Sequence, residues 1–291
     1  MTREAEIQRH ITGMDELLGI VGAMRSLAGM RLQESQHALP GIRNYADSMA
    51  TAIGSALALM LHPATEAHQE QAGRAVILCM AEHGFVGGFN ERLLEAAEPA
   101  LKPSDLLFVL GTRGAALAYE RGCKVTWARA MATRLASAPD AVNSLTTELY
   151  MRIACGQVAR IEVMFARYRQ GAPATIERRL LLPLDTASLA ATKPRQIPLH
   201  NLAPGPLLER LMAEYVFALL TEAAVESIAS ENAARFAAME SAHDNVSKKI
   251  AGLQERARQA RQTEITSELL DLMTGAEAIQ STPRFSRSQF M

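Results

Sequence analysis

The sequence has little of what several common classes of function require. Aromatic residues make up 5% of its 291 residues, too few for the stacking platforms of a protein that binds single-stranded nucleic acid. Lys and Arg total 30 against 31 for Asp and Glu, and this balance gives no electrostatic reason to expect a nucleic-acid partner. Hydrophobic residues reach 48% and charged residues 21%, which is typical of a globular chain and too apolar for disorder.

The sequence also lacks signals for membrane insertion, disulfides and metals. No apolar run reaches the ~18 residues that a membrane span requires, and the charged N-terminus lacks the apolar core of a signal peptide. We therefore expect a soluble chain with no direct membrane span. The cysteines, Cys79, Cys123 and Cys155, show neither CxxC nor metal-type spacing, so we interpret them as free thiols of a reducing compartment. The seven histidines are scattered as well, and no metal site is predicted.

Both ends of the chain carry apolar residues at helical spacing. From Ile7 to Leu32 they step by four and three, which is the period of a coiled-coil seam. We expect this first helix to end or kink at Pro40-Gly41, because proline lacks a backbone donor, and then to resume. A second helix is predicted from Pro204 onward, with seam residues at Met239, Ala242, Val246, Ile250, Leu253, Ala257 and Ala260.

The length of the second helix indicates how it is used. It would be on the order of 100 Å long at about 1.5 Å per residue, more than a compact domain of this size can bury. We therefore expect it to project and to need a partner for its apolar stripe, which restarts at Ile265 after a break in phase. The N-terminal heptad segment is the obvious partner, so an antiparallel coiled coil of the two chain ends is predicted.

The middle of the chain changes from helical to strand-like period. Apolar runs predict strands, and amphipathic stretches between them predict helices, an alternation typical of an α/β layer with a largely parallel sheet. The expected strands are 75–80, 105–110, 124–127, 160–168 and 174–184, and the expected helices are 90–102, 113–122 and 140–156. The turn RQGAP predicts a hairpin between the last two strands.

The predicted fold class is therefore α+β or mixed: an antiparallel coiled coil of long N- and C-terminal helices with an inserted Rossmann-like α/β domain. The predicted domains are an N-terminal helical arm at 1–70, an inserted α/β domain at 71–203, a C-terminal helical arm at 204–280 and a tail at 281–291.

The glycine-rich stretch EHGFVGGFN, residues 82–90, follows the first expected strand and raises the question of a nucleotide site. It fits neither GxGxxG nor GxxxxGK[ST], and no lysine follows it to meet phosphates. We interpret Gly84, Gly87 and Gly88 as allowing a tight strand-to-helix turn, with Asn90 capping the next helix. No cofactor and no catalytic residue is predicted.

Two stretches of the second helix carry a specific family resemblance. They are ESIASENAARFAAMESA at 226–242 and RQTEITSELLDLMTGAE at 261–277. They resemble the γ subunit of F-type ATP synthases, whose pattern is roughly ES-x-ASE-x-x-AR-M-AAM-x-x-A followed by RQ-x-x-IT-x-E-L-x-E-I-x-x-GA. Weaker matches are the 82–90 loop, which is similar to that family's SDRGLCGGFN, and the AM pair at Ala23-Met24.

Departures from that pattern indicate a divergent member of the family. After Met24 the stretch MRSLAGMRLQESQ has few of the family's lysines, Ala257-Arg258 replaces the usual Tyr-Asn, and a tail follows Gly275-Ala276.

The resemblance implies a non-catalytic rotor shaft that couples a membrane ion-driven ring to a head that makes or hydrolyses ATP. It implies as partners the α and β subunits of the F1 head, an ε-type subunit and the membrane c-ring. Arg261, Gln262 and Thr266 match family positions that hydrogen-bond loops of the catalytic subunits, and Met24 is a further candidate contact. The implied location is peripheral, on the cytoplasmic face of a bacterial inner membrane.

Simpler interpretations are open for these residues and for the chain as a whole. Arg261 and Gln262 would also suit an exposed, solvated helix face, and Met24 would suit packing beside the seam. As a whole, the chain could instead be a freestanding coiled-coil adaptor or scaffold, or a nucleotide-dependent α/β enzyme.

Overall fold

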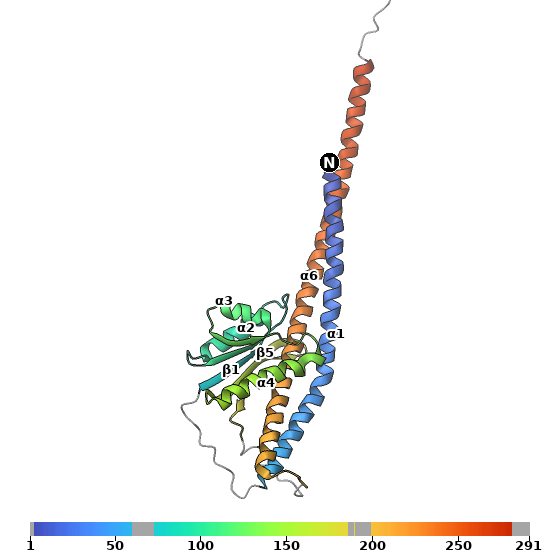
Figure 1. Ribbon diagram of the computed structural model, residues 1–291. Coiled ribbons are helices and arrows are strands. Elements are labelled where there is room, and N and C mark those ends of the chain that lie inside the picture. The colour runs from blue at the N-terminus through green and yellow to red at the C-terminus, as the bar shows by residue number, and fades with distance from the viewer. Residues whose placement is uncertain (1–2, 60–72, 186–188, 190–198, 281–291) are drawn as a thin grey trace, which may run out of the picture. The chain divides into compact units, whose positions relative to one another are not determined.

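A computed structural model describes residues 3–59, 73–185, 189 and 199–280 (Figure 1). The predicted tail at 281–291 and most of the stretch between the first helix and the first strand lie outside these residues. The chain divides into two units, one of Met1–Ala23 with Glu240–Met291 and one of Met24–Met239. The second unit thus includes the whole sheet together with the adjoining parts of both long helices.

Helix α1 runs from Arg3 to Leu57 and contains Pro40. Of the two outcomes expected at Pro40-Gly41, an end of the helix is wrong, because helical residues continue on both sides. Proline inside a helix costs about 3 kcal/mol or more, since it removes one hydrogen bond and crowds the preceding turn. Tertiary packing supplies the compensation: Leu39 is buried in the core and Ile42 packs against it.

Helix α6 runs without interruption from Pro204 to Gln280, close to the predicted bounds. In the first unit its seam residues Ile250 and Leu253 are buried, as are Ile11 and Val21 of α1. Over the described ranges, no helix combines the length and the apolarity needed to cross a bilayer.

The sheet has five strands in the order β3-β2-β1-β4-β5. The first four strands are parallel to one another, and β5 pairs antiparallel with β4 through the hairpin predicted from RQGAP. The strands are β1 (Gly73–Cys79), β2 (Leu106–Leu110), β3 (Val125–Arg129), β4 (Val158–Arg169) and β5 (Ala172–Leu182). The connecting helices are α2 (Phe89–Ala97), α3 (Thr112–Glu120) and α4 (Ala138–Ala154), with 3-10 turns η1 (Glu98–Ala100) and η2 (Leu135–Ser137).

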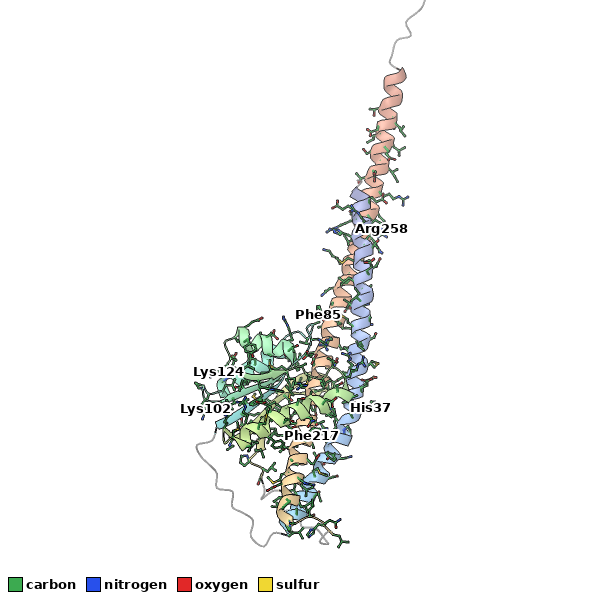
Figure 2. All side chains as sticks on the ribbon, in the orientation of Figure 1. His37, Phe85, Lys102, Lys124, Phe217 and Arg258 are labelled. Carbon is green, nitrogen blue, oxygen red and sulfur yellow. The ribbon has the colours of Figure 1, made fainter. Side chains whose placement is uncertain are left out.

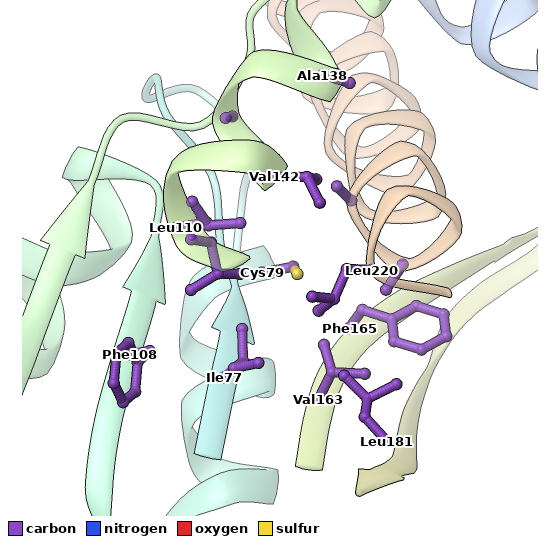
Figure 3. Packing of buried hydrophobic residues seen from close by; sticks show 14 of the residues in the cluster. Ile77, Cys79, Phe108, Leu110, Ala138, Val142, Val163, Phe165, Leu181 and Leu220 are labelled. Carbon is purple, nitrogen blue, oxygen red and sulfur yellow. The ribbon is translucent and has the colours of Figure 1, made fainter. Parts of the chain in front are cut away.

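Each face of the sheet buries its own apolar core. On one face, α2 and α3 cover residues such as Val76 and Leu78 of β1. On the other face, α4 and α6 cover Ile77 and Cys79, and Figure 3 shows Leu220 of α6 above β4. This alternation along β1 is the expected period-2 pattern of a strand that is buried on both faces.

Candidate functional site

The stretch of α6 that carries the first family-like pattern begins within the longest buried run of the helix, residues 220–232. Six of its polar residues are at most 6% exposed: Glu226, Ser227, Ser230, Glu231, Asn232 and Arg235. Burying polar groups is costly unless each finds a hydrogen-bond partner, so these residues must be paired.

Two serines join α6 to the sheet. Ser227 Oγ donates to the carbonyl oxygen of Cys79 at the end of β1, at 2.5 Å. Ser230 Oγ donates to the carbonyl oxygen of Ala166 in β4, at 2.8 Å. The helix therefore spans β1 and β4, the two strands between which the strand order reverses.

Arg235 extends this junction into the 82–90 loop. Its guanidinium donates to the carbonyl oxygens of His83 and Gly84 at 3.3 Å, and to Glu231 Oε1 at 2.6 Å. It also donates to Asn232 Oδ1 at 3.2 Å. One buried side chain therefore fixes the backbone of the loop relative to α6.

The three glycines of the loop differ in their backbone conformation. Gly87 has φ +55°, a conformation that favours glycine, whereas Gly84 and Gly88 have no positive φ and an added Cβ would meet nothing within 4 Å. Phe85, 68% exposed, adopts φ 60° without being glycine, which is uncommon for a bulky residue. Figure 2 labels its side chain on this loop.

Asn90 does not cap the following helix. Helix α2 begins at Phe89 with Gly88 as its N-cap and no capping side chain, so the capping interpretation is wrong. Asn90 is 4% exposed, and its Oδ1 accepts a hydrogen bond from the Ala81 backbone N–H at 2.9 Å. It ties the helix back to the end of β1 because that buried donor needs a partner.

Glu82, which comes shortly after the end of β1, lies at the N-terminus of α3. Its Oε2 accepts from the backbone N–H of Thr112, the first residue of α3, at 3.0 Å, and from that of Met131 at 2.8 Å. Its Oε1 accepts from Thr112 Oγ1 at 2.7 Å. Helix N-termini attract anions, and here a carboxylate of the chain itself fills that role.

Glycines outside the 82–90 loop leave no room for a side chain, among them Gly73, where a Cβ would lie 2.6 Å from the Gln157 carbonyl oxygen. Gly111 has φ +112°, and a Cβ there would lie 2.4 Å from the Met80 carbonyl oxygen. A Cβ on Gly114 would lie 2.1 Å from Met80 Cβ. Both let α3 approach the end of β1 closely. The only sequence signal is their G-x-x-G spacing directly after β2.

A second polar cluster joins α6 to α1 and to two strands. Glu222 and Glu226 lie one turn apart on α6, and both are paired with Arg43 of α1. Arg179 of β5 lies 2.5 Å from Glu222, and Arg167 of β4 lies 3.4 Å from Glu226. We call these five residues the carboxylate junction.

The charges of the carboxylate junction outweigh burial at Glu222 but not at Glu226, where burial raises the pKa of the carboxyl despite the nearby Arg43 and Arg167. Burial by itself would raise the pKa of the Glu222 carboxyl, but hydrogen bonding and charge from Arg179, and then from Arg43, outweigh burial. The pKa of Glu222 therefore lies below its usual value. An ionised, directional contact is thus favoured at this point of the helix.

The proposed head-contacting residues lie in the first unit, near the end of α6. Arg261, Gln262 and Thr266 are all exposed. Thr266 Oγ1 donates to the carbonyl oxygen of Gln262 at 2.8 Å, which places these two on one line of the helix. Arg261 instead lines a groove of about 320 Å³ together with Glu4 and Gln8 of α1.

The spacing argument therefore holds only in part for these three residues. At about 3.6 residues per turn, Arg261 and Thr266 point about 140° apart around the axis. Gln262 and Thr266 therefore lie on one side of the helix, and Arg261 does not share it. Met24 is half-buried on α1 and belongs to the other unit, so it is not part of this exposed surface.

Comparison with known proteins identifies the family. The sequence model of a family described as ATP synthase matches residues 3–279, nearly the whole chain. The chain belongs to the ATP synthase γ family. A curated relative, the ATP synthase gamma chain of Dechloromonas aromatica (strain RCB), is 26% identical over 288 residues, covering 94% of this chain and 98% of the relative.

Solved structures of low identity share the γ-family fold. One is a chain of the Euglena gracilis mitochondrial ATP synthase in an OSCP/F1/c-ring assembly, with TM-score 0.64, 13% identity and 99% of both chains covered. Another, from the rotor of the same enzyme, has TM-score 0.61 and 12% identity, with 90% of this chain and 98% of that chain covered. A third, from the central stalk and c-ring of the Tetrahymena thermophila mitochondrial enzyme, has TM-score 0.54 and 16% identity, covering 77% of this chain and 99% of that chain.

Membership of the γ family changes what the signature residues mean. The subunit is a non-catalytic rotor component, so its residues have no chemistry to perform. Glu226, Ser227, Ser230, Glu231 and Arg235 hold α6 to the sheet and to the 82–90 loop. Sequence reasoning recognised these residues as a family pattern without finding this role.

Proposed function

We propose that this γ-family chain is the central rotor shaft of an F-type ATP synthase, coupling rotation of the membrane ring to the opening and closing of catalytic sites in the head. The observation that carries the proposal is the family match across residues 3–279. The polar junction of α6 with the sheet supports it, because a shaft that carries torque needs its helices anchored to the domain that is driven.

We propose further that the N- and C-terminal arms form an antiparallel coiled coil. In the second unit, Gly29 of α1 lies against Phe236, while Tyr45 lies 3.0 Å from Glu214. Advancing along α1 thus means moving back along α6. In the first unit, residues of both helices line a groove of about 700 Å³ that includes Ile7 and Leu253. These contacts support an antiparallel seam in each unit.

The free end of α6 is the part that we propose enters the head. Between residues 261 and 274 its large apolar residues are exposed, in contrast to the buried seam residues Ile250 and Leu253 before them. They are Ile265 at 49%, Leu269 at 56%, Leu270 at 60%, Leu272 at 71% and Met273 at 69%. Such a stripe is unfavourable in water and suits an apolar collar formed by partner subunits.

The partners follow from the same proposal. The α and β subunits of the head surround the helical end, where Arg261, Gln262 and Thr266 contact catalytic-subunit loops, and Met24 contacts the head lower on α1. The α/β domain meets an ε-type subunit and the c-ring. The complex sits peripherally on the cytoplasmic face of a bacterial inner membrane, and the chain reaches the membrane only through these partners.

Co-purification tests the rotor function most directly. The full-length chain carries an affinity tag in its native host, and the captured complex is examined for a hexameric ATPase head with bound nucleotide. We expect the α and β subunits to be captured stoichiometrically, with ATPase activity in the eluate. Recovery of the chain alone, or with partners but without an ATPase subunit, would contradict the rotor function and favour a freestanding adaptor.

A further inference from the structure

The carboxylate junction has a geometry suited to resisting rotation of α6. Glu222 and Glu226 project from one side of the helix because they are four residues apart. Their arginine partners come from three other elements: Arg43 from α1, Arg167 from β4 and Arg179 from β5. If α6 turned about its own axis, its two glutamates would lose their ion pairs with all three elements at once.

The distances show how little rotation the junction tolerates. Arg43 Nε lies 3.1 Å from Glu222 Oε1, and Arg179 Nη1 lies 2.5 Å from Glu222 Oε2. A side-chain oxygen at a radius of about 5 Å moves by about 2.6 Å when the helix twists by about 30°. Hydrogen bonds weaken steeply beyond their normal length, so a twist of that size would break both contacts. Hydrophobic burial is non-directional, so the limit on rotation comes from these ion pairs together with the hydrogen bonds of Ser227 and Ser230 to the sheet.

Stability does not explain why charges are placed here. The side chains of Glu222 and Glu226 are 6% and 2% exposed. Buried ion pairs lose hydration that their attraction repays only in part, and apolar replacements are often as stable or more so. The surroundings offer an apolar alternative, because Leu220, Ala223 and Val225 of the same helix turns lie in the core. These ion pairs therefore contribute a defined orientation of α6 rather than net stability.

We propose that the carboxylate junction is the torsional lock that makes α1, α6 and the sheet turn as one body. The lock rests on the proposed rotor function and adds to it the residues that pass torque between the shaft helices and the α/β domain. Arg43 is the central member because it pairs with both carboxylates from α1.

The chain offers a matched control. Glu162 is 2% exposed and, like Glu222, is held by arginines: Arg160 Nε lies 2.8 Å from it and Arg178 Nε lies 2.7 Å from it. Those partners lie in β4 and β5, and Arg74 of β1 lies 3.5 Å from the same carboxylate, so these three partners all come from the sheet. Glu162→Gln removes the same charge from a similar buried network, so it separates loss of stability from loss of torsional coupling.

Torsional stiffness is measured on the assembled ATPase complex with its head fixed to a surface. A probe is attached through the exposed Cys155, at the end of α4 in the α/β domain, and its angular fluctuations are recorded. For Glu222→Gln with Glu226→Gln we expect the angular variance to rise about twofold or more, because neutral amides lose the charge-assisted contacts. Glu162→Gln should leave the variance at the wild-type value.

One further variant keeps the result decisive. Arg43→Lys keeps the charge but loses the planar two-point contact, and we expect a smaller increase in angular variance even if the double variant fails to assemble. Unchanged variance in every junction variant that assembles, or an equal rise in Glu162→Gln, overturns the lock. Failure of the wild-type chain to join any ATPase head would instead overturn the rotor function itself.

Discussion

Helix α6 is held in two different ways along its length. Between residues 204 and 239 it buries glutamates, serines and an arginine against the sheet, each with a named partner. Between residues 240 and 274 the described buried residues are Ile250 and Leu253, both apolar. One stretch is anchored by directional contacts, and the other is packed by a thin seam.

The difference indicates separate mechanical tasks for one continuous helix. Directional contacts set a single angular position of the helix on the sheet, which suits the place where torque enters. A seam of small and aliphatic residues leaves the outer surface free to meet several partners in succession. The four predictions below test this division, beginning with the largest expected effect.

Removing Arg235 should lower the free energy of unfolding more than the other substitutions. Arg235→Ala leaves Glu231 buried without its cation, and breaking a buried pair typically costs about 3–5 kcal/mol. The Arg235 and Glu231 side chains are each 8% exposed. Denaturant unfolding of the full chain, followed by near-ultraviolet signals of the α/β domain, measures this loss.

Arg258 provides the control for Arg235. It pairs with Glu255 in the same helix, but their side chains are 73% and 53% exposed, and Arg258 lies out on the helix surface (Figure 2). Arg258→Ala should leave the unfolding midpoint unchanged, because exposed pairs are screened by water. Similar losses for both variants would contradict the division between anchored and seam-packed stretches.

Truncating the seam should have the next largest effect. Leu253 is 7% exposed, and Leu253→Ala should destabilise the first unit by about 2 kcal/mol, the low end for a core leucine, because a two-helix seam relaxes easily. Hydrogen exchange of residues 240–264 reports the change. Leu272→Ala, at a position 71% exposed, serves as the control and should leave exchange as in the wild type.

Deleting one hydroxyl of the anchored stretch should have a smaller effect. Ser230→Ala removes the hydrogen bond to the Ala166 carbonyl and should cost about 1 kcal/mol. Ser267→Ala, at an exposed position of the same helix, gains the same helix propensity without losing a sheet contact. The two variants are compared by thermal unfolding. If Ser230→Ala is as stable as Ser267→Ala, the serine contact is not an anchor.

Substitutions at the exposed end should barely affect folding. Arg261→Ala with Gln262→Ala should change the free energy of unfolding by less than about 0.5 kcal/mol, as is usual for exposed positions. Turnover of the assembled ATPase should fall, because we propose that these side chains contact catalytic-subunit loops. Turnover and torque equal to wild type would show that both residues only solvate the helix surface.

Much of the fold could be predicted from local patterns. The strand run at 75–80 and the helix from Pro204 appear in the structure within a few residues of their expected bounds. An end of the first helix at Pro40, one of the two outcomes expected there, was wrong, because the local cost of proline was outweighed by packing of Leu39 and Ile42 that no local pattern reveals. Asn90 was misassigned for a similar reason: its partner, Ala81, became visible only once the end of β1 was placed.

The candidate site was less predictable than the fold. The 82–90 loop drew attention through its glycines, yet the glycines that leave no room for a side chain include Gly111 and Gly114, whose close neighbour Met80 lies about 30 residues earlier in the chain. Ser227 carried a family resemblance but no visible role. Its acceptor, Cys79, is 148 residues away in sequence.

By itself, the sequence determined which segments are helix and strand and which side of each is apolar. Periodicity expresses those properties within a few turns, and burial of apolar surface depends little on the identity of the neighbour. Only the tertiary structure decided what the polar residues do. A buried hydrogen bond or ion pair requires one partner at one distance, and for Glu222 that partner, Arg43, comes from the opposite end of the chain.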